Sequence, residues 1–358
     1  MGDKPMNRKI TVIGAGNVGS TIAYTLAIMD LASEIVLIDI NENKLVGEAM
    51  DIQQSTVFYS TTHIVAGDYP DAADSGIVII TSGLPRKPGQ TRLDLTKANV
   101  DIMKSIAPRI AKYAPDAIYL IVSNPVDIMT YVFAKVSGIP ENRVIGSGTT
   151  LDTARLRSKL AKDLDVAEKS VHAYVLGEHG DTSFIPWSLA NISNVPIHEC
   201  HKSIAIGGEL VPEPNYAEIE DYVRKSGARV IERKGATFFA VSASVVHLCR
   251  CLLGGTDTIT TVSTMMNGEY GIEDVASLDG ADGCDMEFDS VPDFEEVIDA
   301  DTELIYNTDD EETAEIIADS FGDCDEDDLS SKIDAYVKEI EKFENGETAD
   351  FSLSDFDI

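Results

Sequence analysis

One histidine in this sequence has the neighbours that acid–base chemistry requires. His179 lies in the segment GEHGD, between Glu178 and Gly180. An imidazole exchanges protons near neutral pH, so it suits a general acid or base. A histidine alone is more often structural, because a catalytic one needs a carboxylate to orient it. Asp152, in the segment TLDTARLR, is the candidate for that carboxylate.

Arg155 adds a second reactive group to the same segment. It follows Asp152 by three residues, so the two side chains share a face if the segment is helical. A planar guanidinium can form paired hydrogen bonds to a carboxylate. The pattern therefore favours a reaction in which His179 moves a proton while Arg155 binds the carboxylate of a small substrate.

A glycine-rich turn near the N-terminus indicates a dinucleotide. Gly14, Gly16 and Gly19 form GAGNVG directly after an apolar run and at the start of a helical pattern. Such glycines let a pyrophosphate approach the helix N-terminus. Asp39 follows Gly19 by twenty residues, where a carboxylate binds both ribose hydroxyls and repels a 2′-phosphate. We predict a dinucleotide site, and NAD rather than NADP as its ligand. The alternative interpretation is a glycine-rich turn and a surface aspartate that bind no dinucleotide.

The elements that must position these residues alternate along the first 150 residues. Apolar runs separated by helical patterns are typical of a parallel sheet covered on both faces. Right-handed crossovers then give a doubly wound, Rossmann-type α/β fold. The expected strands are 9–14, 34–39, 63–67, 76–83, 117–125 and 144–148, and the expected helices are 18–30, 43–55 and 94–114.

The remaining sequence has a different pattern, with helices expected over 150–164 and, without interruption, over about 216–253. We predict an NAD-binding domain over residues 8–148. A catalytic, α+β substrate domain is predicted over residues 149–345.

Acidic residues are concentrated at the C-terminal end. The net charge is −34, and residues 271–358 contain 32 acidic and 3 basic residues. This balance repels nucleic acid and anionic lipid, so neither is expected as a partner. Dense acid is typical of a solvated segment. We expect a divergent acidic segment over about 276–330 and an acidic tail over 346–358.

Composition also limits the other classes of site. No run of eighteen apolar residues and no secretory signal is present, so a cytoplasmic protein is expected. The five cysteines form no CxxC pattern and are expected as free thiols. The segment HECH at 198–201 has no second cluster of ligands, so no metal site is predicted.

Several motifs, in this order, resemble the L-lactate/L-malate dehydrogenase family: GAGNVG, Asp39, TSGLPRKPGQTRLDL, SNPVD, GSGTTLDTARLR and GEHGD. The resemblance covers roughly residues 8 to 275. It implies a two-domain NAD enzyme, usually a homotetramer, that reduces a 2-oxo acid by hydride transfer. It also implies that His179 gives the proton, that Asp152 orients His179, and that Arg155 binds the substrate carboxylate.

The resemblance assigns further residues to the substrate and cofactor. Arg92 would polarise the substrate carbonyl, brought in by a loop with Gly83 and Gly89 as hinges. Asn124 would contact the substrate and the nicotinamide end, with a cis bond to Pro125. The expected cofactor-binding residues are Gly14, Gly16, Asn17, Val18, Gly19, Asp39, Lys44, Tyr69, Gly83, Val122, Ser123, Asn124 and Ser147.

Arg86 bears on which 2-oxo acid is the substrate. In the family, this position contacts the variable end of the substrate, and arginine is usual in malate dehydrogenases. A second guanidinium suits a second carboxylate and lacks a partner when pyruvate offers a methyl group. Arg86 alone therefore favours oxaloacetate and malate.

Other residues resemble the lactate dehydrogenases instead. GEHGD, GSGTTLD, Trp187 and Thr237, the last at the expected substrate pocket, match that branch. Arg157 and His172 match the pair that binds fructose 1,6-bisphosphate in bacterial allosteric members. The alternative interpretation is a solvated arginine and a half-buried histidine. We favour L-lactate dehydrogenase, with L-malate dehydrogenase as the alternative.

The C-terminal region departs from the family. After residue 275 the family has a β-hairpin rich in Val and Gly, whereas this sequence continues into acidic residues, and only 331–343 resembles the expected final helix. A hypothesis of another class follows, in which the protein is an inactive NADH-binding sensor or scaffold. The complete set of predicted catalytic residues favours the enzyme.

Overall fold

The computed structural model describes residues 6–84, 92–180, 182–254, 258–267 and 273–280. These residues belong to the first of two compact units, Met1–Ala300 and Asp301–Ile358. The boundary predicted after residue 148 lies inside that first unit, and the predicted substrate domain over 149–345 extends past its end at Ala300. Both predicted domain bounds stay predictions. The acidic segment and the tail lie outside the described residues.

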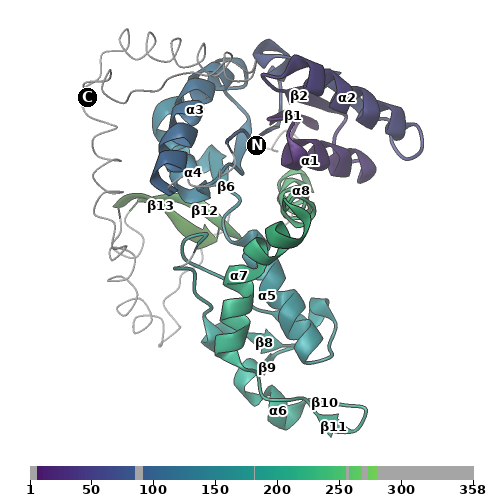
Figure 1. The fold of residues 1–358 in the computed structure, drawn as a ribbon, viewed down its shortest axis with the longest axis vertical. Helices are drawn as coiled ribbons and strands as arrows, with labels where there is room; N and C mark the ends of the chain where they lie inside the picture. Colours follow the sequence, from purple (N-terminus) through teal and green to yellow (C-terminus); the bar gives the residue numbers. More distant parts are fainter. Residues whose placement is uncertain (1–5, 85–91, 181, 255–257, 268–272, 281–358) are drawn as a thin grey trace, which may run out of the picture. The chain divides into compact units, whose positions relative to one another are not determined.

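A parallel sheet forms the centre of the N-terminal half (Figure 1). Its neighbouring strands run in the order β3-β2-β1-β4-β5-β6, and every pair among them is parallel. The order reverses between β1 and β4, which is where doubly wound sheets bind ligands. The strands are β1 (Lys9–Ile13), β2 (Glu34–Ile38), β3 (His63–Ala66), β4 (Ile77–Ile80), β5 (Ile118–Ile121) and β6 (Val144–Gly146).

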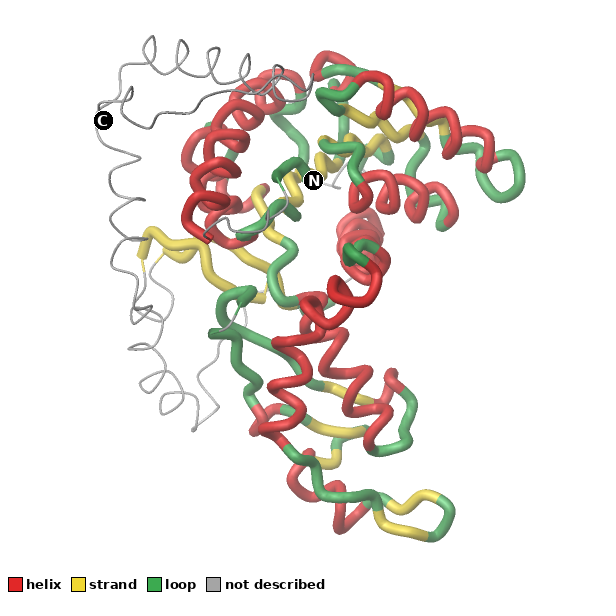
Figure 2. Tube along the Cα trace, viewed as in Figure 1, coloured by secondary structure: helices red, strands yellow, loops and turns green. Residues whose placement is uncertain are grey.

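Helices cover both faces of this sheet, as the red segments of Figure 2 show. Strand residues alternate between two apolar clusters, because successive side chains of a strand point to opposite faces. Ile10 and Val12 pack with α1, α2 and α8, whereas Ile13 packs with α3 and α4. These helices are α1 (Asn17–Ile28), α2 (Glu42–Thr56), α3 (Arg92–Tyr113), α4 (Val126–Ser137) and α8 (Phe239–Gly254). The predicted doubly wound fold is confirmed.

An antiparallel hairpin extends the sheet beyond β6. Strands β12 (Thr261–Asn267) and β13 (Glu273–Gly280) pair with each other, and Ser263 of β12 pairs with Gly146 of β6. The sequence prediction did not include this hairpin. The region after residue 275, where we expected acidic residues in place of the family's hairpin, falls largely outside the described residues.

The C-terminal half packs around a third apolar cluster, formed by α5 (Thr150–Asp163), α7 (Tyr216–Lys234) and small strands. One prediction here is wrong, because the expected continuous helix over 216–253 is two helices. Gly235 ends α7 with a φ of +85°, and its N–H binds Ile231 O. Glycine adopts this conformation without steric cost, and α8 starts four residues later.

The other described elements are short. They are β7 (Val171–His172), β8 (Asn191–Ile192), β9 (Val195–Pro196), α6 (Cys200–Ser203), β10 (Ala205–Ile206) and β11 (Glu209–Leu210), with 3-10 turns at Tyr69–Ala72, Glu141–Arg143, Glu168–Ser170, Trp187–Leu189 and Ile197–Glu199. Within the described ranges, no helix is both long enough and apolar enough to span a membrane.

Candidate active site

The glycine turn after β1 is built for close approach. Gly14 has a φ of +103°, and a Cβ on Gly19 would lie 1.8 Å from Gly14 O, so both positions exclude other residues. A Cβ on Gly16 would meet no atom within 4 Å, so one side of the turn is open. Asn17 and Val18 begin α1 there, where helix N–H groups favour an anion. The turn fits the pyrophosphate of a dinucleotide.

Asp39 follows β2 and is held beside this turn. Its Oδ2 accepts a hydrogen bond from Ala15 N at 2.6 Å, and its Oδ1 accepts one from Asn41 N at 2.9 Å. Ala15 belongs to the GAGNVG motif, so the carboxylate is fixed next to the predicted pyrophosphate site. The geometry fits a carboxylate that binds ribose hydroxyls.

The ends of β4 and β5 carry the next group of predicted cofactor residues. Ser123 is buried, and its Oγ donates to Ser82 O at 2.5 Å. Asn99 of α3, which sequence reasoning missed, links the segments that follow β4 and β5. Its Oδ1 accepts from Leu84 N at 2.7 Å and its Nδ2 donates to Asn124 O at 2.8 Å. The expected cis bond between Asn124 and Pro125 is confirmed.

The other predicted cofactor residues lie on separate elements. Val122 is buried after β5, Lys44 is exposed on α2, Tyr69 starts a 3-10 turn, and Gly83 and Ser147 follow β4 and β6. Their roles stay predictions.

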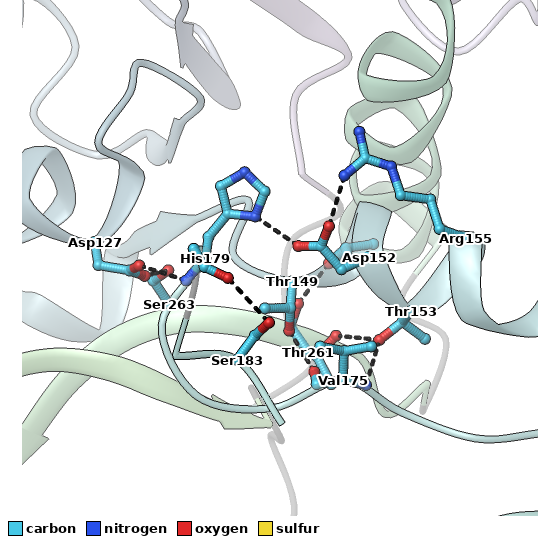
Figure 3. Close-up of polar contacts among 12 residues, drawn as sticks. Asp127, Thr149, Asp152, Thr153, Arg155, Val175, His179, Ser183, Thr261 and Ser263 are labelled. Carbon is cyan, nitrogen blue, oxygen red and sulfur yellow. Dashed lines mark hydrogen bonds and ion pairs between the residues drawn. The ribbon is translucent and has the colours of Figure 1, made fainter. Parts of the chain in front are cut away.

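The structure brings together the three residues predicted to do chemistry (Figure 3). His179 Nδ1 lies 2.5 Å from Asp152 Oδ2, and Arg155 Nη1 lies 2.7 Å from Asp152 Oδ1. Asp152 is buried, whereas 28% of the His179 side chain is exposed. Because Nδ1 binds the carboxylate, Nε2 is the atom left to exchange a proton, and it points away from Asp152 in Figure 3.

A second carboxylate, missed by sequence reasoning, holds the backbone of His179. Asp127 in the first turn of α4 accepts a hydrogen bond from His179 N at 2.9 Å through Oδ2. Its Oδ1 accepts from the Ser263 hydroxyl of β12. His179 is therefore fixed from α5 through its ring and from α4 through its backbone.

Two carboxylates set the protonation of this imidazole. Burial lowers the pKa of His179, but the hydrogen bond and charge of Asp152, with the charge of Asp127, more than offset it. Arg155 opposes them, and the net shift of the His179 pKa is upward. Burial raises the pKa of Asp127, partly offset by the hydrogen bonds from Ser263 and His179. The site therefore favours the protonated imidazole more than water does.

Arg155 lies against α7 at a position without a side chain. A Cβ built on Gly227 would be 3.3 Å from Arg155 Nη2, closer than most real contacts. Thr237 is half-buried between α7 and α8. Arg92 is the first residue of α3, but its side chain lies outside the description, as do Arg86 and Gly89 entirely.

The two residues of the predicted effector site come from neighbouring elements. Arg157 of α5 donates to Glu168 O at 3.4 Å, a long contact, and His172 is exposed at the end of β7. The described geometry leaves their role a prediction.

Comparisons with known proteins agree with the site. Residues 8–146 match the family model described as lactate/malate dehydrogenase, NAD binding domain, and residues 149–292 match its alpha/beta C-terminal domain. An L-lactate dehydrogenase of Acetivibrio thermocellus is 45% identical over 282 residues, covering 77% of this chain and 86% of that protein. L-lactate dehydrogenase 1 of Clostridium acetobutylicum is 46% identical over 271 residues, covering 75% and 85%.

Solved structures give the same picture. The minor L-lactate dehydrogenase of Enterococcus mundtii superposes with a TM-score of 0.75 at 34% identity, covering 84% of this chain and 98% of that chain. A lactate dehydrogenase from a Medee basin deep-sea metagenome library gives a TM-score of 0.71 at 38% identity, covering 77% and 86%.

Proposed function

The chain belongs to the lactate/malate dehydrogenase family, and we propose that it is an NAD-dependent L-lactate dehydrogenase, which converts pyruvate and NADH to L-lactate and NAD. The observation that carries the proposal is the Asp152 carboxylate bound to both His179 and Arg155. It places a proton donor beside a carboxylate-binding cation, the two groups that reduction of a 2-oxo acid requires.

His179 is the proton donor of this proposal. Its Nε2 gives a proton to the substrate oxygen as the carbonyl becomes an alcohol, and Asp152 stabilises the imidazolium and fixes the ring. Arg155 uses the donors not bound to Asp152 to hold the substrate carboxylate. NADH, when bound at the GAGNVG turn and Asp39, supplies the hydride.

Four residues from other parts of the chain complete the proposed site. Arg92 polarises the substrate carbonyl, Arg86 and Thr237 line the pocket, and Asn124 contacts the substrate next to the nicotinamide. A guanidinium that approaches the carbonyl oxygen stabilises the negative charge that develops there.

Initial rates of NADH oxidation with pyruvate and with oxaloacetate test the substrate. The proposal predicts a higher kcat/KM for pyruvate. A higher kcat/KM for oxaloacetate would instead support the malate dehydrogenase alternative, which Arg86 favours because its charge suits a second carboxylate. NADH binding without turnover of either acid would support a sensor or scaffold.

Two further proposals concern assembly and regulation. The enzyme is a homotetramer, and fructose 1,6-bisphosphate binds at Arg157 and His172, where cations from two elements suit phosphate groups. Repeating the pyruvate assay with the effector tests the second proposal, and an Arg157→Gln variant is its control. An unchanged rate at saturating effector would refute it.

A further inference from the structure

Two buried threonines, Thr149 at the N-cap of α5 and Thr153 within the helix, bind both polar groups of one backbone residue (Figure 3). The Thr149 hydroxyl donates to Val175 O, and the Thr153 hydroxyl accepts from Val175 N at 2.9 Å. Thr149 is fully buried, Thr153 is 8% exposed and Val175 is 1% exposed. The Thr153 hydroxyl also lies 3.1 Å from the Thr261 hydroxyl, to which it can donate while accepting from Val175.

These threonines share a helix face with the carboxylate that binds His179. Thr149 is the N-cap of α5, and Asp152 and Thr153 follow it by three and four residues, a spacing that places the three side chains at the same side of the helix N-terminus. The same face therefore binds Val175 at one end of a five-residue segment and the His179 ring at the other.

The backbone of Val175 forms its hydrogen bonds with side chains and not with a neighbouring strand. Its neighbour Leu176 exchanges both backbone hydrogen bonds with Phe184, at 2.9 Å each, whereas Val175 binds the two threonines. A buried peptide group without a partner is costly, so the segment must stay where both hydroxyls reach it. Two hydroxyl groups thus fix the position of the Val175 backbone relative to α5.

We propose that Thr149 and Thr153 are positioning residues that hold the Val175 backbone against α5 and so keep the His179 imidazole aligned with Asp152. This inference rests on the proposed function, because it assigns the threonines a role through His179. From the other side, α4 contributes Asp127, which binds His179 N. The charged groups that face the imidazole are Asp152 and Arg155 from α5 and Asp127 from α4.

Thr149→Val and Thr153→Val in the full-length protein test the proposal, because valine keeps the shape and removes the hydroxyl. We expect kcat/KM for pyruvate to fall by about tenfold or more, since small misplacements of reacting groups are costly. We also expect the alkaline limb of the pH profile of kcat/KM to move to lower pH. A less well aligned Asp152 raises the pKa of His179 by less, so it offsets less of the lowering caused by burial. Thr153→Ser, which keeps a hydroxyl, should keep both kcat/KM and the position of the alkaline limb close to those of wild type.

Thr62→Val is the matched control. The Thr62 hydroxyl is buried and donates to Ala32 O at 2.8 Å. Thr62 directly precedes β3, and Ala32 lies between α1 and β2, away from the proposed site. Its loss should lower thermal stability without moving the pH profile. If the α5 variants behave like Thr62→Val, with less stability and a wild-type pH profile, the threonines are only structural and the proposal is wrong.

An NMR titration of His179, assigned with His179→Ala, makes the test independent of turnover. The proposal predicts a lower His179 pKa in Thr153→Val than in wild type, and equal values would overturn it. Absence of wild-type turnover would refute the proposed function, yet this titration would still decide the positioning role. If the valine variants do not fold, Thr153→Cys, with a weaker and longer acceptor, should give a smaller shift in the same direction.

Discussion

The Nδ1 atom of His179 lies 2.5 Å from Oδ2 of Asp152, although 27 residues separate the two along the chain. The second oxygen of the same carboxylate binds Arg155 at 2.7 Å. One buried carboxylate thus orients both the proposed proton donor and the proposed substrate clamp. This relationship determines how the site should respond to mutation and to pH.

Asp152→Asn should lower kcat/KM for pyruvate by about 10²-fold or more, because acid catalysis needs an oriented and protonated His179. The variant removes the charge that raises the His179 pKa, so the alkaline limb of the pyruvate profile should move to lower pH. A pH profile of kcat/KM measures both effects. An unshifted limb would show that Asp152 does not control His179.

The same pair should make stability depend on pH. The folded pKa of His179 is raised, so its contribution is fully present below the ordinary histidine pKa and is lost as pH rises through the folded value. Urea unfolding across that range should show a decline in wild type that is smaller in Asp152→Asn. Equal declines in the two proteins would contradict this linkage.

Asp127→Ala should destabilise the protein by roughly 1–3 kcal/mol, because it leaves the Ser263 hydroxyl and the His179 N–H without their acceptor. The pKa of His179 should also fall, since one of the charges that raise it is gone. Ser263→Ala is the control that removes one donor and keeps the charge. Urea unfolding and the pH profile separate the two effects, and an unchanged profile in Asp127→Ala would contradict the second.

Gly227→Ala should raise KM for pyruvate several-fold with a smaller change in kcat. The new Cβ would lie 3.3 Å from Arg155 Nη2, so the guanidinium must move by a few tenths of an ångström. Gly47→Ala in α2 is the matched control, because a Cβ there meets no atom within 4 Å. Both substitutions favour helix, so stability cannot explain a difference. Equal KM values in the two variants would show that Arg155 tolerates the new Cβ.

Asp39→Asn should weaken NADH binding by about tenfold, the effect of losing charge-assisted hydrogen bonds worth about 1.5 kcal/mol. Discrimination against NADPH should fall at the same time, because the repulsion of the 2′-phosphate is removed. The ratio of KM for NADH and NADPH in wild type and variant measures the change. A constant ratio would mean that another group selects the cofactor.

Local motifs and the pairing of His179 with Asp152 were predictable from the sequence, whereas the other long-range partners of the site were not. The glycine turn, Asp39 and the parallel strands each follow from a short local pattern, namely an apolar run, the residues of the turn after it, or the start of the next helix. Asp127 and Ser263 are 136 residues apart, and no periodicity pairs them, so the fold alone reveals their contact with each other and the contact of Asp127 with His179. Gly227 was also unpredictable, because its meaning depends on where the Arg155 side chain lies.

The break between α7 and α8 illustrates a second limit. Helical periodicity continues on both sides of Gly235, so the pattern predicts one helix. The positive φ of that glycine and the loop before Phe239 depend on packing with the rest of the chain. The signal available in the sequence was the glycine itself, which is common just after a helix end.

The most direct measurement of the central claim compares wild type with His179→Ala, following NADH binding by fluorescence and pyruvate reduction by initial rates. The account predicts that the variant binds NADH as wild type does, because His179 lies outside the glycine turn, and that turnover falls by about 10²-fold or more. Turnover at the wild-type rate would contradict the assignment of His179 as the proton donor.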